Sequence, residues 1–404
     1  MFEHILQTND FEPILVDKAK GSWIWDVDGK KYLDCTSGVW CLHLGHNHPE
    51  IVQTIKNQSE KLIHRNNRFL TPITIEAAEK ILNFIPGNYD RITFLNSGSE
   101  AVEFAINLAK KITGREQILS LQDSFCGSYG TAKSISYTSG KEDKLKIPYE
   151  TCDYDNCTCL EELMPVLDKL FQEDSFTPAG FVLEPVIVSG GIYKPCKKYV
   201  EIVCKRVQEA GGLIIANEVT TGFGRSGEKF GFLHYDINPD VIALGKSLGA
   251  GYPVSAIATY AHLESKIPQE QMYYVQSHQL DPLGAAIAKT FVEILEKEKI
   301  IDKNQDMIRH FKEFFSNLNH PYIKEIRSYG MIIGIQIQPY KDKTSSEIIL
   351  EIKDELLKEG IIIGISLGKE LLRLLPPLNL KKEEIEFLIE KMSLAFENFR
   401  KKMN

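Results

Sequence analysis

The chain has 404 residues, of which 43% are hydrophobic and 25% charged, the composition of a folded protein with a large buried core. Its net charge of -8 argues against a nucleic-acid surface and against binding to anionic membranes. No apolar run reaches the roughly 18 residues of a membrane span, and the first residues lack a basic, signal-like start, so we expect a cytoplasmic protein.

The eight cysteines are scattered along the chain, and a protein of this length needs no disulfide bonds for stability. The scattered cysteines therefore indicate that the protein is located in a reducing compartment, the cytoplasm. Cys152, Cys157 and Cys159 do lie close together in the sequence. Their spacing is not a paired C-x-x-C and no histidine is near, so the sequence does not favour a metal site there.

The N-terminal region predicts a small β unit, because residues 23–26 and 31–34 flank an Asp-Gly turn that is typical of a hairpin. Three histidines, His43, His46 and His48, follow within six residues. No acidic residue accompanies them at helical spacing, so we interpret them as structural residues and expect no bound metal.

From about residue 50 onward, predicted strands and helices alternate. The main strands are 91–95, 117–120, 180–183, 213–216 and 241–244, and a C-terminal group covers 323–328, 331–338, 361–365 and 371–375. Strands separated by helices indicate an α/β protein with a mostly parallel sheet flanked by helices, whose ligands gather where the strands end. We expect this large domain to cover residues 49–298, a smaller α+β domain to cover 299–404, and the N-terminal segment 1–48 to join the smaller domain.

Residues 96–100, Asn-Ser-Gly-Ser-Glu, follow a predicted strand and open a predicted helix. Free backbone N–H groups and the positive end of the helix dipole suit a phosphate, and Ser99 can add a hydroxyl group. A plain serine cap followed by an acidic first turn explains the same residues equally well. The pattern G-x-x-x-x-G-K-S/T is absent, which excludes a nucleotide P-loop.

Two further predicted strands end in glycine-rich turns about thirty residues apart, and the second turn carries Lys246 between glycines. A lysine in such a turn is usually a solvated loop residue. If the neighbouring residues are buried, the pKa of the lysine falls and the amine becomes a nucleophile for a carbonyl group. The turn alone leaves both interpretations open.

Taken in chain order, the motifs resemble those of the class III (ω-type) aminotransferases, which are pyridoxal-phosphate enzymes of fold type I. The resemblance covers nearly the whole chain. The matching segments are Asp28-Gly29, Leu44-Gly45-His46, Asn96-Ser97-Gly98-Ser99-Glu100-Ala101, Glu184-Pro185, Glu218-Val219, Gly222-Phe223-Gly224-Arg225, Pro239-Asp240, Gly245-Lys246, Asp281-Pro282-Leu283 and Leu372-Arg373-Leu374. It implies transfer of an amino group from an amino acid or amine donor to a keto acid, with pyridoxal 5′-phosphate as cofactor. It also implies a homodimer with active sites at the subunit interface.

The resemblance also implies roles for individual residues. Lys246 is similar to the catalytic lysine that holds the cofactor as a Schiff base and then moves a proton on the substrate. The residues in cofactor-binding positions are Ser97, Gly98, Ser99, Phe125, Asn217, Val219, Thr220, Lys246 and Ser277. Among these, Phe125 corresponds to the ring stacked on the pyridine, and Ser277 to a residue that reaches the phosphate of the neighbouring subunit. Cys126 replaces the family's histidine.

On the substrate side, Glu184 and Arg373 correspond to a pair that can switch between an ion pair and an open state. The planar guanidinium group suits a carboxylate, although Arg373 would also suit a purely structural pair. Trp40 falls where relatives line the pocket with an aromatic ring, and a plain core tryptophan explains it equally well.

Two positions depart from the family pattern. Asn217 stands where the family has an aspartate that pairs with the pyridine nitrogen, and Thr220 stands where a glutamine is common. A neutral amide does not hold the nitrogen protonated, so we expect a largely unprotonated pyridine nitrogen and a weaker electron sink. We expect Thr220, which is shorter than glutamine, to reach the cofactor only through water.

The departures leave two alternatives to an aminotransferase. One is a racemase or decarboxylase of the same fold, since residues 277–283 are closer to the dialkylglycine decarboxylase version of this segment. The other is a binding protein without catalytic activity, against which Lys246 weighs because binding alone does not need it.

Overall fold

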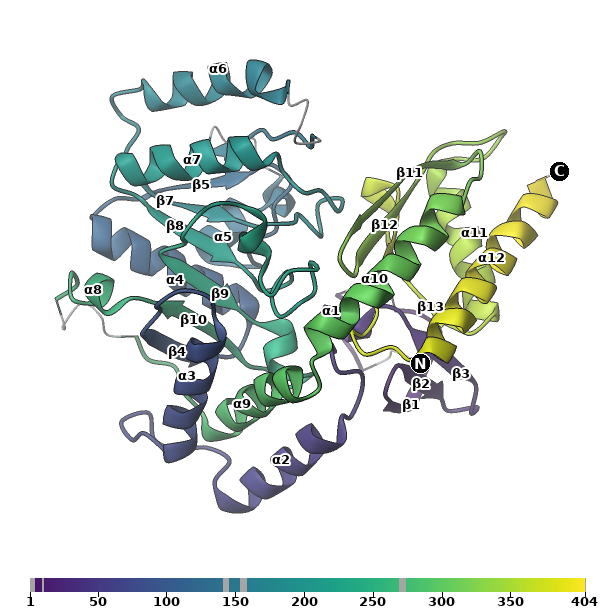
Figure 1. Cartoon of the computed structure of the whole chain (residues 1–404), viewed down its shortest axis with the longest axis horizontal. Coiled ribbons are helices and arrows are strands. Elements are labelled where there is room, and N and C mark those ends of the chain that lie inside the picture. The colour runs from purple at the N-terminus through teal and green to yellow at the C-terminus, as the bar shows by residue number, and fades with distance from the viewer. Residues whose placement is uncertain (1–3, 9–10, 141–144, 153–157, 269–273, 404) are drawn as a thin grey trace.

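The computed structural model describes residues 4–8, 11–140, 145–152, 158–268 and 274–403. Its larger part is built on strands β4 (Arg91–Leu95), β5 (Gln117–Leu121), β6 (Lys146–Ile147), β7 (Pro178–Leu183), β8 (Leu213–Asn217), β9 (Val241–Leu244) and β10 (Ser255–Thr259). They form one sheet in the order β4-β10-β9-β8-β7-β5-β6 (Figure 1). All of them run in the same direction except β10, which is antiparallel to both neighbours. The prediction of a mostly parallel sheet is confirmed.

Strand β10 was not predicted. Its sequence, Ser-Ala-Ile-Ala-Thr, consists mainly of small residues, with only Ile257 and Thr259 β-branched and no aromatic residue, so its own strand signal is weak. All five of its residues are nevertheless buried, because the strand lies between β4 and β9. Its position between two neighbouring strands, rather than its own propensity, makes it a strand.

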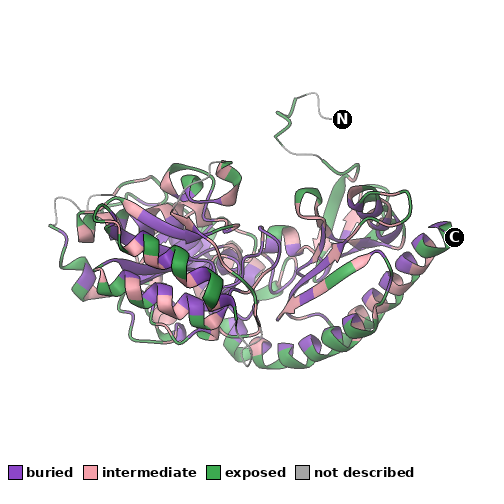
Figure 2. Ribbon diagram, turned by 90° about the horizontal axis from the view of Figure 1, so that it is seen from above, coloured by how far each residue is buried: buried purple, intermediate pink, exposed green. Residues whose placement is uncertain are grey.

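Helices cover both faces of this sheet (Figure 1). They are α2 (Pro49–Lys61), α3 (Pro72–Phe84), α4 (Gly98–Thr113), α6 (Cys159–Phe171), α7 (Lys197–Glu209) and α9 (Pro282–Lys297), with short helices α1 (Ser37–Trp40), α5 (Gly130–Ser134) and α8 (Ala261–Glu264). The apolar side of α4 is buried in one hydrophobic core, and that of α7 in another. Figure 2 shows the same pattern, with buried strands surrounded by helices that alternate buried and exposed residues.

The smaller part of the molecule contains two further sheets. The first joins β1 (Val16–Lys20), β2 (Trp23–Asp26) and β3 (Lys31–Asp34) to β13 (Ile361–Ile362), and the second joins β11 (Ile323–Tyr329), β12 (Ile332–Ile337), β15 (Leu371–Leu374) and β14 (Gly364–Ser366). Helices α10 (Ile300–Asn317), α11 (Ser345–Lys358) and α12 (Lys382–Met403) complete it. The parallel pairing of β3 with β13 supports the proposed assignment of the N-terminal segment to the smaller domain.

The prediction of a single strand at 361–365 is wrong in one respect. It is two short strands, β13 and β14, that belong to different sheets. The predicted hairpin of β2 and β3 is confirmed. Within the described part of the chain, no helix is long and apolar enough to cross a membrane.

Arg225 connects the two parts of the molecule. It lies in the loop after β8, is fully buried, and donates hydrogen bonds to the carbonyl oxygens of Met331 and Pro376 and to Nδ1 of His43. Burial lowers its pKa to about 9. One side chain of the large domain thereby contacts the backbone of the C-terminal domain and a side chain of the N-terminal segment.

Candidate active site

The candidate residues from the sequence meet at one edge of the central sheet. Ser99, Phe125, Glu184 and Lys246 follow β4, β5, β7 and β9, and Asn217 is the last residue of β8. Because these strands run in the same direction, their carboxyl ends lie side by side. The topology alone therefore gathers side chains that are up to about 150 positions apart in the sequence.

Lys246 begins a short 3-10 turn directly after β9, and its backbone φ of 44° lies in the left-handed region that residues with a side chain seldom adopt. Its Nζ donates a hydrogen bond to the Thr220 hydroxyl and lies 4.6 Å from the ring centroid of Trp40. Desolvation lowers the pKa of Lys246 to about 8, although Cys41 and Glu184 act in the opposite direction. More of the amine is therefore neutral near neutral pH than in an exposed lysine, and the neutral form is the one that acts as a nucleophile.

The start of α4 packs tightly against the neighbouring turns. A Cβ atom at Gly98 would lie 2.5 Å from Cγ1 of Val219, and Gly245 approaches the same two residues. Ser97 caps the helix by accepting a hydrogen bond from the backbone N–H of Glu100 at 3.2 Å. The serine cap expected from the sequence is present, and only glycine at position 98 allows Val219 to sit against the helix end.

Ser99 extends this helix terminus toward the loop after β5. Its hydroxyl accepts a hydrogen bond from the backbone N–H of Ser128 at 3.1 Å, and a Cβ at Gly127 would lie 2.8 Å from the Ala132 side chain. The loop after β5 and the first turn of α4 therefore face each other across backbone and small side chains. Such a surface of a helix N-terminus, hydroxyl groups and backbone amides suits a phosphate group.

Phe125, Glu184 and Asn217 are joined by direct hydrogen bonds. The amide of Asn217 donates to the Phe125 carbonyl at 3.1 Å, and the Phe125 N–H donates to the Glu184 carboxylate at 2.8 Å. The second carboxylate oxygen of Glu184 accepts from the Val188 N–H at 3.1 Å. Burial raises the pKa of Glu184 to about 7, against the effect of these hydrogen bonds. This carboxyl group therefore titrates near neutral pH, in contact with the loop that holds Phe125.

Arg373 reaches the site from β15 in the smaller domain. Its guanidinium lies 5.3 Å from the centroid of Trp40, the same ring that Lys246 contacts, and its Nη2 donates to the Ile365 carbonyl at 2.7 Å. Its Nε is buried and has no hydrogen-bond partner among the described residues. Among the described residues, no ion pair joins Arg373 to Glu184. The guanidinium group of Arg373 can therefore bind another anion.

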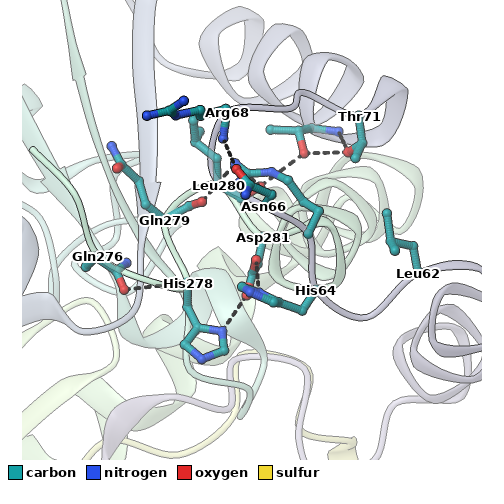
Figure 3. Close-up of polar contacts among 12 residues, drawn as sticks. Leu62, His64, Asn66, Arg68, Thr71, Gln276, His278, Gln279, Leu280 and Asp281 are labelled. Atoms are coloured by element: carbon teal, nitrogen blue, oxygen red, sulfur yellow. Dashed lines mark hydrogen bonds and ion pairs between the residues drawn. The ribbon is translucent and has the colours of Figure 1, made fainter.

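The segment that carries Ser277 lies against a second loop of the same chain (Figure 3). Asp281 accepts hydrogen bonds from Nδ1 of His64 at 2.8 Å and from Nδ1 of His278 at 2.6 Å, and Arg65 donates to the Gln279 carbonyl at 2.9 Å. Ser277 itself is exposed. It is the one predicted cofactor residue that no described contact joins to the Lys246 site of its own chain.

The three clustered histidines of the N-terminal region separate in space. His43 contacts Arg225, His46 pairs with Asp34 at 2.9 Å, and His48 lies 3.5 Å from Glu298. Each has its own partner, and these contacts link parts of the fold to one another.

Two features of the site were not visible in the sequence. Thr220 contacts Lys246 directly, a contact that no sequence pattern indicated. Burial lowers the pKa of Arg373, and Tyr137 lies close enough to act in the opposite direction. No local motif marks Tyr137, and only the packing of the smaller domain on the larger one reveals it.

Comparison with known proteins identifies the family. Residues 6–396 match the family model of aminotransferase class-III. The chain belongs to the class III aminotransferases. It is 30% identical to the acetylornithine aminotransferase of Methanosarcina mazei, over 97% of this chain and 94% of the relative. It is 31% identical to that of Methanothermobacter thermautotrophicus, over 96% and 94%.

A solved structure shows the same fold. The PMP-bound form of an aminotransferase from Vibrio fluvialis aligns with a TM-score of 0.85 at 23% identity, over 96% of this chain and 92% of that chain. This chain is therefore a transaminase. Its cofactor is pyridoxal 5′-phosphate.

The residues of the site fit this cofactor. Lys246 supplies an amine of lowered pKa, the first turn of α4 supplies backbone amides with the hydroxyl of Ser99, and Phe125 supplies an aromatic side chain. Asn217 supplies a neutral amide where the family has a carboxylate. The amine thus suits the aldehyde of the cofactor, the backbone amides and the hydroxyl suit its phosphate, and the aromatic side chain suits its flat ring. The amide would give the ring nitrogen an uncharged partner.

Proposed function

We propose that this aminotransferase takes an amino donor that carries a carboxylate, with Lys246 as the catalytic residue and Arg373 as the carboxylate-binding residue. One observation carries the proposal: Lys246 and Arg373 lie against the same indole ring of Trp40, so that Nζ and the guanidinium carbon are within about 10 Å of each other. A small amino acid spans such a distance. The unpartnered Nε of Arg373 supplies a hydrogen-bond donor for its carboxylate.

The roles of the side chains follow from their positions. Lys246 accepts and returns a proton at the carbon that carries the amino group, and its lowered pKa allows both steps near neutral pH. Thr220 orients the amine through its hydroxyl group. When bound, pyridoxal 5′-phosphate withdraws electrons from that carbon. The ring of Trp40 lies beside both the amine and the guanidinium and covers part of each.

We further propose that the cofactor is held by the first turn of α4, with Ser97, Gly98 and Ser99 at its phosphate, and by Phe125, Asn217, Val219 and Thr220 around its ring. The contacts that join these residues to one another and to Lys246 support this assignment. The carboxylate of Glu184, with a pKa of about 7, accepts hydrogen bonds from the backbone N–H groups of Phe125 and Val188, which leaves Arg373 open to a substrate carboxylate.

For the donor, we propose a terminal amine at the end of a carboxylated chain, as in N-acetylornithine, with 2-oxoglutarate as acceptor. The names of the archaeal relatives and the unpartnered Nε of Arg373 support this class. A panel of donors tests it: N-acetylornithine, ornithine, alanine and 1-phenylethylamine, each with 2-oxoglutarate or pyruvate. A larger kcat/KM for the amine without a carboxylate would contradict the proposal.

The sharper test is substitution of Arg373. In Arg373→Met, kcat/KM for carboxylated donors should fall about 10- to 100-fold, the value of one or two charged hydrogen bonds, while the rate with 1-phenylethylamine stays within about twofold. Arg373→Lys is the matched control, because it keeps the charge but not the planar fork. An equal loss for both classes of donor would assign Arg373 a structural role instead.

We also propose that the enzyme works as a cytoplasmic homodimer in which Ser277 reaches the phosphate site of the partner subunit. Its exposure at the surface of one chain, with no described contact to Lys246 of that chain, supports this arrangement. Light scattering should give about twice the chain mass. Ser277→Ala should weaken cofactor binding without changing that mass, and a monomer with full activity would contradict the proposal.

A further inference from the structure

Three cysteines from separate parts of the chain meet at the outer layer of the large domain. Cys152 lies in the loop after β6, Cys159 is the first residue of α6, and Cys196 is the N-cap of α7. Their sulfur atoms all lie within 4.8 Å of one another, and those of Cys152 and Cys159 are 3.7 Å apart. We propose that Cys152, Cys159 and Cys196 bind a zinc ion that ties α6 to α7.

The sulfur separations match a zinc site better than a disulfide. With Zn–S bonds of about 2.3 Å, two sulfurs on a tetrahedral zinc ion are about 3.8 Å apart. The Cys152–Cys159 separation of 3.7 Å is close to that tetrahedral edge, whereas bonded sulfurs lie about 2.05 Å apart. One sulfur pair therefore has the separation that zinc requires, and Cys196 has its sulfur within 4.8 Å of both.

The surroundings also favour a bound cation with thiolate ligands. Cys159 and Cys196 stand at the N-termini of α6 and α7, and the positive ends of both helix dipoles favour the negatively charged thiolates. Both side chains are buried in an apolar core that includes Leu163, Tyr199 and Val200. Low polarity strengthens the attraction between zinc and thiolate and excludes competing water.

Packing alone does not account for this arrangement. A hydrogen bond from the Cys159 thiol to the Cys152 sulfur accounts for one of the contacts without a metal, but it involves only two sulfurs, whereas the cluster brings three together. Helix α6 is the outermost helix on its side of the sheet and packs on α7 (Figure 1). A metal ion at the point where the two helix N-termini meet would hold this outer helix in place.

Each thiol that becomes a ligand releases its proton, so the affinity for zinc falls at low pH. Structural zinc sites have four ligands, and the three described thiolates leave the fourth position to another donor. Cys157 lies outside the described residues, and the proposal does not depend on it.

Metal analysis of the purified holoenzyme tests the proposal directly. Protein made in zinc-supplemented medium and purified in reducing buffer without chelators should retain about one zinc ion per chain, and Cys196→Ser should lower this at least about tenfold. Cys204→Ser is the matched control, because Cys204 is also a buried cysteine of α7 but is not part of the cluster. It should keep its zinc. Less than about a tenth of a zinc ion per wild-type chain would overturn the proposal.

A second measurement does not depend on any variant folding. Cobalt added to the reduced, zinc-free wild-type protein should give the intense near-ultraviolet absorption of thiolate-to-cobalt charge transfer, and zinc should abolish it. The absence of this band would overturn the proposal. So would an intact mass about 2 Da lower under non-reducing conditions, which would show a disulfide within the cluster. Neither readout uses catalytic activity, so the result is independent of the proposed donor.

Discussion

The side-chain amide of Asn217 donates a hydrogen bond to the backbone carbonyl oxygen of Phe125, at an N–O distance of 3.1 Å. The amide oxygen of the same residue accepts from the Val219 N–H at 3.3 Å. Asn217 therefore acts both as a neutral group at the end of β8 and as a bridge between β8 and the loop after β5. A carboxylate at this position would lose the first of these hydrogen bonds.

Asn217→Asp should therefore destabilise the cofactor-free protein. At pH 8 the new carboxylate would face the Phe125 carbonyl oxygen in a buried position, at a cost of about 1–3 kcal/mol in the free energy of unfolding. Urea denaturation of the apoprotein measures this cost. Asn217→Ala is the control, since it removes the hydrogen bond without adding a charge and should cost less. An Asn217→Asp protein as stable as the wild type would show that the loop after β5 adapts freely.

In the holoenzyme, we expect the pyridine nitrogen of the cofactor to be largely unprotonated at neutral pH, because the amide of Asn217 carries no charge. Nitrogen NMR of enzyme loaded with ¹⁵N-labelled cofactor measures the protonation state. Asn217→Asp should shift the signal toward that of a pyridinium ion. A pyridinium signal in the wild type would contradict the expectation.

The lowered pKa of Lys246 predicts a pH dependence for cofactor attachment. Only the neutral amine attacks the aldehyde, so the attachment rate should fall about tenfold for each pH unit below the pKa of about 8 and level off above it. Mixing apoprotein with pyridoxal 5′-phosphate at several pH values, trapping with borohydride and counting modified Lys246 by mass spectrometry gives the profile.

The same profile tests the contact with Thr220. The Thr220 hydroxyl accepts a hydrogen bond from the Lys246 amine and so stabilises its protonated form. Thr220→Val should move the midpoint to lower pH, whereas Thr220→Ser keeps the hydroxyl and should not. An unchanged midpoint in Thr220→Val would mean that this hydrogen bond has no energetic effect on the lysine.

The contact between Gly98 and Val219 predicts an energetic coupling. Alanine usually stabilises a helical position relative to glycine, but a Cβ at Gly98 would lie 2.5 Å from Val219. Gly98→Ala should therefore cost about 1–3 kcal/mol, and combination with Val219→Ala should recover about 1 kcal/mol or more of it. Thermal unfolding of the two single variants and the double variant measures the coupling. Additive effects would show that the clash is relieved elsewhere.

Several parts of the fold could be predicted from short stretches of sequence. The alternation of strand and helix patterns, and the position of Lys246 and Asn217 where strands end, follow from local hydrophobic periodicity and glycine-rich turns. Strand β10 could not be predicted in this way, because its residues become a strand only between β4 and β9.

The contacts among the side chains around Lys246 could not be predicted from the sequence. Trp40, from the N-terminal segment, and Arg373, from the C-terminal domain, come to lie against each other only because β3 pairs with β13 and β12 with β15. The sequence left the role of Trp40 open, and its contact with both cations is a property of the packed domains. The exposed position of Ser277 likewise depends on how its segment lies on the loop around His64.

The sequence by itself determined the order of the motifs, the class of sheet and the lysine on which the chemistry depends. Each of these depends on residues that are neighbours in the sequence. The tertiary structure alone decided which distant side chains share a site. Cys196 is the plainest case, since it lies 37 positions after Cys159 and enters the cysteine cluster only because α6 packs on α7. Contacts of this kind arise from the packing of whole elements, which local sequence patterns do not encode.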